Sequence, residues 1–160
     1  MNLIPTLDAQ EYRMELFLRS LAPPAARDSQ EAIVERLSGL DERDRIRGFD
    51  LTIWGDQICL DVTPRTATER TIRDKIDRFR LWERTHDASL APGFDERTID
   101  PLVGDSYTVF HTPVIALAVY AGSDVWGVFP CAIGEEVVTV DDCLDAFLRR
   151  GSRLEPRSSG

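Results

Sequence analysis

Long apolar runs, paired cysteines and lysine are scarce in this 160-residue sequence, and the first two scarcities each exclude a class of protein. The longest apolar run, Pro113 to Gly122, is about half of the roughly 20 residues that a membrane-spanning helix needs. The first residues show no basic segment followed by an apolar one, so we expect no signal peptide. Three cysteines without a CxxC spacing argue against a disulfide framework and a zinc ribbon. We therefore expect a cytoplasmic protein with reduced cysteines.

Acidic residues are abundant in this sequence, whereas lysine is nearly absent. The chain has 28 Asp and Glu against 19 Lys and Arg, a formal net charge of -9, and Lys75 is its only lysine. A dense carboxylate surface is typical of proteins adapted to molar salt, where the Debye length is only about 3 Å. Such a surface predicts solubility and says little about the charge of a partner. The length fits one domain with a core of ordinary size.

Apolar periodicity divides the chain into alternating strands and helices. The pattern predicts, in order, a strand, a helix, a hairpin, a second helix, a long loop, a second hairpin and a closing helix, over residues 12–20, 28–40, 49–62, 66–85, 86–105, 114–133 and 141–150. Asp28 with Glu31, and Thr66 with Glu69, have the spacing of a capping box, and Thr139 can cap the last helix. A short strand is expected within the long loop near Glu96 to Ile99, and another at VVTV.

The segment FDLTIWGDQICLDV, residues 49–62, alternates strictly on both sides of Gly55-Asp56. With a two-residue turn at these two positions, all the apolar residues would lie on one face, Ile53 opposite Ile58 and Leu51 opposite Leu60. The other face would carry Asp50, Thr52, Trp54, Gln57, Cys59 and Asp61. The pattern thus predicts an antiparallel hairpin with Trp54 on its outer face and an unfavourable pairing of Asp50 with Asp61.

The element order predicts an α+β fold. Strand, helix, hairpin and helix match the start of a ferredoxin-like, split βαβ core with an antiparallel sheet, to which the second hairpin and closing helix would be added. Two half-domains meeting at the long loop are the alternative. We expect a single domain over residues 1–150 and a disordered tail over residues 151–160.

The chain contains the segments ELFLRSLAPPAARDSQEAIVERL, FDLTIWG, HTPVIALAVY with the following FPC, and TVDDCLDAF. Together these four segments resemble a family of small haloarchaeal proteins of unknown function. The similarity covers about Arg13 to Leu148, and some members carry a generic helix-turn-helix label. The resemblance supports salt adaptation and implies no catalytic residue.

Candidate catalytic residues lack a recognisable motif. A metal could be held by His86, His111 and a cysteine, but no two of them have a helical i, i+4 spacing. Cys131 or Ser106 could act with His111, although no nucleophile elbow or phosphate-binding loop is present. Paired carboxylates such as Asp141 with Asp142 are expected of an acidic surface. We therefore predict no enzyme, no metal and no cofactor, with a small enzyme around His111 and Cys131 as the third hypothesis.

The leading hypothesis is a non-enzymatic domain that acts by self-association, by contact with another protein or by sensing a small ligand. Ferredoxin-like sheets often use their uncovered face in this way, which is an analogy of fold only. That face would carry Phe17, Thr52, Trp54 and Cys59. An exposed Trp54 would be an anchor for a partner, whereas a Trp54 covered by the long loop would make the hairpin a scaffold.

The alternative hypothesis is a DNA-associated transcriptional regulator that uses the basic second helix. Its candidate contacts are Arg70, Arg73, Arg80 and Arg84. Phosphate contacts weaken steeply with salt, and acidic residues four positions away can neutralise these arginines within the helix. The first two helices are separated by the hairpin, so helix-turn-helix spacing is absent. On these grounds we expect neither nucleic acid nor a membrane as a partner.

Overall fold

The computed structural model describes residues 5 and 8–159, with side chains up to Arg149 in the last helix. Within these residues, three helices of 19 or 20 residues and a short 3₁₀ turn (Ala9–Glu11) are arranged with ten strands. The helices are α1 (Pro24–Glu42), α2 (Ala67–Thr85) and α3 (Val140–Ser159). The strands are β1 (Tyr12–Arg19), β2 (Gly48–Trp54), β3 (Gln57–Cys59), β4 (Ala88–Ser89), β5 (Asp95–Ile99), β6 (Tyr107–His111), β7 (Ile115–Ala121), β8 (Asp124–Phe129), β9 (Cys131–Ile133) and β10 (Glu136–Val138).

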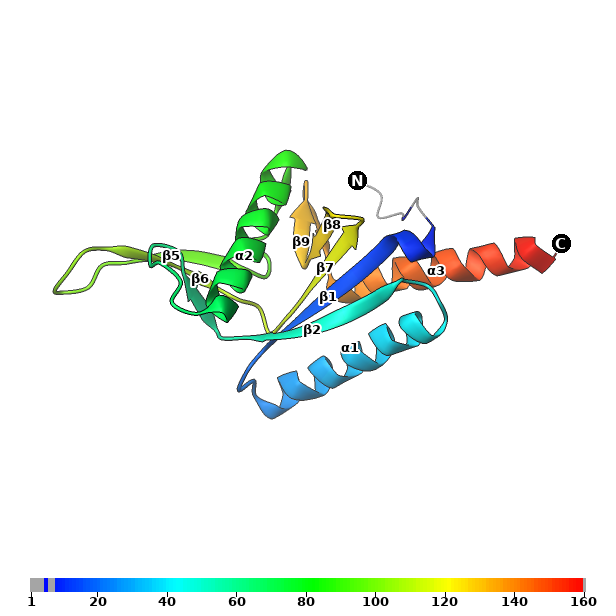
Figure 1. Cartoon of the computed structure of the whole chain (residues 1–160), viewed down its shortest axis with the longest axis horizontal. Helices are drawn as coiled ribbons and strands as arrows, with labels where there is room; N and C mark the ends of the chain where they lie inside the picture. Colours follow the sequence, from blue (N-terminus) through cyan, green and yellow to red (C-terminus); the bar gives the residue numbers. More distant parts are fainter. Residues whose placement is uncertain (1–4, 6–7, 160) are drawn as a thin grey trace.

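A four-stranded sheet, ordered β2-β1-β7-β8, is the centre of the fold. In Figure 1, α2 lies on one side of this sheet, and α1 and α3 lie on the other. Both faces of β1 are therefore covered, and residues from Met14 to Leu18 along it are all buried. A strand covered on two faces loses the exposed side that its alternation predicts.

Two small three-stranded sheets, β10-β9-β4 and β3-β6-β5, flank the centre. The second of them forms an arm that extends away from the helices (Figure 1). Leu102 and Val103, in the connection between β5 and β6, are almost fully exposed.

The predicted α+β class is confirmed, but the ferredoxin-like order is not. Strand β2 follows α1 and lies directly beside β1, parallel to it, with Leu16 opposite Leu51. Strands β7 and β8 form the expected second hairpin, turning at Gly122 with a φ of 64°. Strand β5 occurs close to the short strand predicted within the long loop.

The predicted hairpin over residues 49–62 is wrong. Strand β2 pairs with β1, and β3 pairs with β6 in a different sheet. The large ring of Trp54 is only 2% exposed, whereas Leu51 and Ile53 are 49% and 54% exposed. Alternation determines which residues share a face, but it does not determine which face the rest of the chain covers. Here the indole, with the greater area to bury, lies inside.

Helix ends follow local capping chemistry in two cases of three. Thr66 accepts a hydrogen bond from Glu69 N at 3.0 Å at the start of α2. Thr139 and Asp142 bond reciprocally at the start of α3. Helix α1 begins at Pro24, before the predicted Asp28 cap, because proline is already set to helical φ in the first turn.

The predicted division into a domain over residues 1–150 and a disordered tail over residues 151–160 stays a prediction. Helix α3 continues to Ser159, and the side chains of residues 150–160 lie outside the described part of the chain, as does the whole of Gly160. Among the described residues, no helix is long and apolar enough to cross a membrane.

Candidate functional site

Helix α2 is the most basic helix of the sequence, and four of its six cations make contacts that hold the fold together. Arg73 donates to the carbonyl oxygens of Cys59 and Val62, at 3.2 and 2.8 Å, and so fixes the segment before the helix. Arg80 pairs with Glu96 at 2.9 Å and lies 5.9 Å from the centre of the Phe110 ring. These contacts attach the arm to α2.

Two other cations of α2, Lys75 and Arg78, attach the helix to the central sheet. Arg78 donates to the carbonyl oxygen of Ser123 at 2.6 Å and lies 5.4 Å from the centre of the Tyr120 ring. Lys75 donates to the carboxylate of Glu15. The Lys75 ammonium is held by a buried carboxylate, whereas Arg78 stays exposed and commits only part of its guanidinium.

Arg70 and Arg84 differ from these cations. Both are exposed, and within the described residues their side chains make no hydrogen bond or ion pair. They lie fourteen residues apart, close to four helical turns, on the face of α2 that points away from the sheet. Leu81, 54% exposed, lies on the same face, as do the acidic residues Asp74 and Asp77. The predicted group of four arginines thus separates into two structural and two exposed members.

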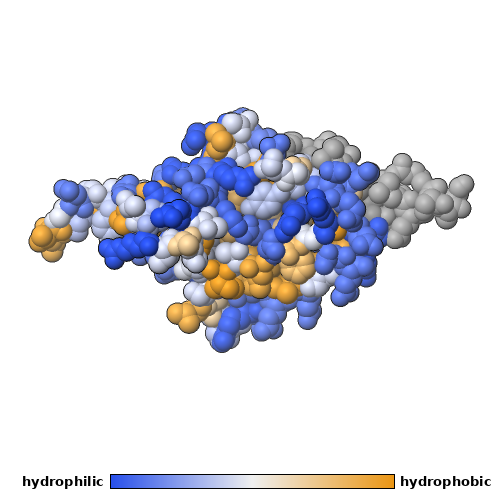
Figure 2. Space-filling view, in the orientation of Figure 1, coloured by the Kyte–Doolittle hydropathy of each residue, from blue (hydrophilic) through white to orange (hydrophobic). Residues whose placement is uncertain are grey.

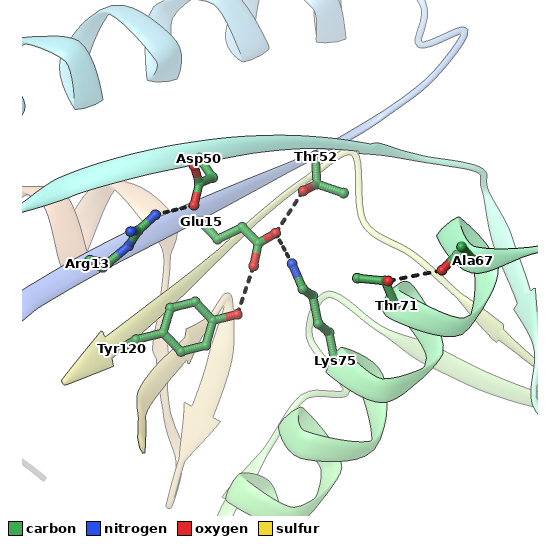
Figure 3. A network of polar contacts seen from close by, with 8 residues as sticks. All are labelled: Arg13, Glu15, Asp50, Thr52, Ala67, Thr71, Lys75 and Tyr120. Carbon is green, nitrogen blue, oxygen red and sulfur yellow. Dashed lines mark hydrogen bonds and ion pairs between the residues drawn. The ribbon is translucent and has the colours of Figure 1, made fainter. Parts of the chain in front are cut away.

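Beneath α2 lies a buried carboxylate that the sequence pattern did not reveal (Figure 3). Glu15 is 4% exposed and accepts hydrogen bonds from Thr52 Oγ1 at 2.7 Å and from Tyr120 Oη at 2.9 Å. Its third donor is Lys75. Burial, and then the charge of Glu15, raise the pKa of Tyr120 well above its usual value. The only sequence signal for the buried carboxylate is that Glu15 lies among apolar residues in a strand. The same pattern also fits a glutamate on the exposed face of that strand.

This cluster joins four elements, β1, β2, β7 and α2, through one side chain. Three donors offset the cost of burying the Glu15 charge. Next to it, Arg13 pairs with Asp50 on the surface (Figure 3). Asp61, the expected neighbour of Asp50, instead accepts a hydrogen bond from Thr108 N at 2.6 Å. The unfavourable Asp50–Asp61 pairing predicted from the hairpin therefore does not arise.

The predicted interaction face of Phe17, Thr52, Trp54 and Cys59 is not an open surface. Phe17 is fully buried and stacks on Trp54, with ring centres 4.5 Å apart. Phe94, from the long loop, packs edge-on against Trp54 at 5.8 Å. Thr52 bonds to Glu15, and Cys59 is half-buried. The long loop therefore covers Trp54, which is not exposed to a partner in this structure.

A pocket of about 380 Å³ lies between the β2–β3 connection and the start of α2. Trp54, Cys59 and Arg73 are among its lining residues. The guanidinium of Arg73 is already bound by backbone oxygens, and Glu69 accepts from Arg65 N at 2.7 Å at the helix start. Arg73 and Glu69 are thus bonded within the chain, whereas the buried indole Nε1 of Trp54 has no hydrogen-bond partner among the described residues. Small-ligand sensing at this pocket stays a prediction.

Neither Cys131 nor Ser106 shows the environment of a nucleophile. Burial raises the pKa of the Cys131 thiol to about 11, and burial with the nearby Cys131 raises that of Cys143. A reactive cysteine needs the opposite shift. Ser106 bonds to Asp100, and His111 lies on β6, in a different sheet from Cys131 on β9. The described part of the chain has no group of three His, Cys, Asp or Glu placed to hold a metal.

Comparison with known protein families matches residues 6–152 to a family described as a helix-turn-helix domain. No curated protein and no solved structure matches the chain. Because helix-turn-helix domains are DNA-binding modules, the expectation that nucleic acid is not a partner is wrong. The helix-turn-helix label carried by the resemblance is confirmed, whereas a haloarchaeal origin stays a prediction. The match spans nearly the whole chain, which therefore belongs to this helix-turn-helix domain family.

Proposed function

We propose that the protein is a cytoplasmic, non-enzymatic DNA-binding regulator that contacts the duplex through the exposed face of α2. Membership of the helix-turn-helix domain family is the observation that carries this proposal. It favours the regulator, the alternative hypothesis from the sequence, over an interaction domain that does not bind DNA.

The choice of α2 rests on charge and exposure. Strands separate α1 from α2 and α2 from α3, so no pair of described helices is joined by the short turn of a helix-turn-helix unit. A DNA-contacting helix must therefore act without an adjacent partner helix. Arg70 and Arg84 supply cations that the fold does not use, and Leu81 supplies an apolar contact between them. Arginine suits both phosphates and guanine edges.

The acidic surface limits where DNA can approach. With a net charge of -9, most of the molecule repels phosphate. The duplex should contact the molecule only around Arg70 and Arg84. Because Asp74 and Asp77 on the same face balance these two charges, removing both arginines leaves the face negative and should have a large effect.

Selection from a random 30-base-pair duplex library, followed by fluorescence anisotropy on the enriched duplex at several KCl concentrations, tests the proposal. The double variant Arg70→Ala/Arg84→Ala should bind at least about tenfold more weakly. If both arginines contact phosphates, the slope of log K against log salt should become shallower by about 1.8.

The matched control is Arg27→Ala/Arg149→Ala, which removes two exposed arginines from α1 and α3. It should bind like the unchanged protein. Failure to enrich any duplex at 0.1 M KCl, or equal losses in both double variants, would refute this function for α2.

A further inference from the structure

The outer edge of β2 is an unpaired strand edge with apolar side chains. Strand β2 is the first strand of the central sheet, and among the described residues no strand lies on its outer side. Ser20 N donates to Trp54 O at 2.9 Å, so the carbonyl of Trp54 points toward β1. Because successive residues in a strand alternate in direction, Phe49, Leu51 and Ile53 point their N–H and C=O groups outward.

The side chains along this edge are unusually apolar for a surface. Leu51 and Ile53 are about half exposed, and Phe49 is partly exposed. In Figure 2, hydrophobic surface is concentrated where β2 and α1 lie in Figure 1. Strand β2 has no lysine, proline or bulge over its seven residues, which are three devices by which edge strands avoid pairing with another chain. Its one charged residue, Asp50, is paired with Arg13 of the same chain.

We propose that β2 pairs antiparallel with β2 of a second copy of this chain, around a two-fold axis at Leu51. In that register Leu51 faces Leu51 of the second copy, and Phe49 faces Ile53. These are the residues whose backbone groups point outward, so each facing pair can exchange two hydrogen bonds. A two-fold interface must be complementary to itself, and the sequence FDLTI has the same polarity pattern in both directions from Leu51.

Charge favours the same register. Asp50 then faces Thr52 of the second copy, and it remains paired with Arg13 of its own chain. An axis one residue earlier, at Asp50, would place the two Asp50 carboxylates opposite each other, which is unfavourable. The apolar and the charged residues therefore select the axis at Leu51.

This pairing would join two central sheets into one. The two-fold axis would be perpendicular to the joined sheet, so both copies of α2 would lie on one face and both copies of α1 on the other, as the single chain in Figure 1 is layered. Two α2 helices could then contact one duplex. That last consequence rests on the proposed function, whereas the dimer does not.

Sedimentation equilibrium of the full chain in 0.1 and 2 M KCl tests the dimer. The unchanged protein should be dimeric at micromolar concentration. Leu51→Lys should weaken association at least about tenfold, and circular dichroism should show that it folds, because Leu51 is half exposed in the single chain. The matched control is Val137→Lys, which places lysine at another half-exposed position, on β10.

Disulfide cross-linking tests the register. In a background with Cys59→Ser, Leu51→Cys should form a disulfide-linked dimer under mild oxidation, because facing Cα atoms about 5.5 Å apart suit a disulfide. Thr52→Cys should cross-link far less, since it faces Asp50. A monomeric unchanged protein, a dimer that Leu51→Lys leaves intact, or equal cross-linking at positions 51 and 52 would each overturn the proposal. Loss of DNA binding alone would leave it standing.

Discussion

The ammonium of Lys75 lies against the buried carboxylate of Glu15, so the only lysine of the chain attaches α2 to the central sheet. The carboxylate side chain is 6% exposed and the lysine side chain 26%. The exposed arginines of α2 can be presented to a ligand because this pair, with Arg73 and Arg78, holds the opposite side of the helix in place.

Glu15→Gln should lower the free energy of unfolding by about 3 kcal/mol, because it leaves Lys75 partly buried without an opposite charge. Urea unfolding measures this, with Glu35→Gln on the exposed surface of α1 as a control expected to change little. The double variant Glu15→Leu/Lys75→Met should be more stable than Glu15→Gln. A loss for Glu15→Gln no greater than for Glu35→Gln would contradict the structural role.

The hydroxyl of Tyr120 should make stability fall in alkali. Burial, and then the Glu15 charge, raise its pKa in the folded state above the unfolded value near 10. Its contribution is therefore fully present below pH 10 and is lost as the pH rises further. Unfolding free energies from pH 8 to 11.5 should decline more steeply for the unchanged protein than for Tyr120→Phe above pH 10. Parallel curves would show that the phenol is not protected.

Native thiol labelling should distinguish the three cysteines. Cys131 and Cys143 are buried with raised pKa values, whereas Cys59 is half exposed. Iodoacetamide at pH 8 should modify Cys59 alone in the folded protein and all three in guanidinium chloride, as read by mass spectrometry. Cys59→Ser should then take up no label when folded. Rapid labelling of Cys131 in the folded protein would instead support the hypothesis that Cys131 is a nucleophile.

Gly93→Ala should destabilise the protein by about 1–3 kcal/mol. An added Cβ at this position would lie 2.5 Å from Cγ of Pro130, and the contact secures the loop that carries Phe94 onto Trp54. Gly39→Ala, in α1 with no atom near the added carbon, should instead stabilise by up to about 1 kcal/mol. Urea unfolding compares the two, and a neutral Gly93→Ala would show that the loop can move away.

Salt adaptation predicts that the melting temperature rises between 0.1 and 2 M KCl. The acidic pairs Glu135–Glu136 and Asp141–Asp142 are exposed, and salt screens the repulsion among such carboxylates. Thermal unfolding followed by circular dichroism measures the effect. A melting temperature that falls with added KCl would remove the basis for the halophile hypothesis.

Local chemistry made some elements predictable. The caps of α2 and α3 involve residues three positions apart, and the β7–β8 hairpin turns within a few residues, so neighbouring sequence contains the whole interaction. The hairpin predicted over residues 49–62 has equally regular alternation, yet it does not form. The strands that pair with its two halves are distant in the chain, since paired residues of β1 and β2 are 35 positions apart and those of β3 and β6 are 50 to 54 apart.

The candidate site was likewise predictable from the sequence only in part. The basic character of α2 is visible in the sequence, but its separation into structural and exposed arginines depends on where Glu96, Ser123 and the carbonyls before the helix lie. The burial of Glu15 likewise depends on α2 crossing the face of β1.

By itself the sequence determined the α+β class, the capped helices α2 and α3, the acidic net charge and the basic helix, because these follow from composition and from contacts between near neighbours. Only the tertiary structure decided that Trp54 lies inside, that Leu51 and Ile53 line an unpaired edge, and that Arg70 and Arg84 remain exposed. The physical reason is that alternation defines two faces of a strand or helix, whereas burial depends on which distant segment covers each face.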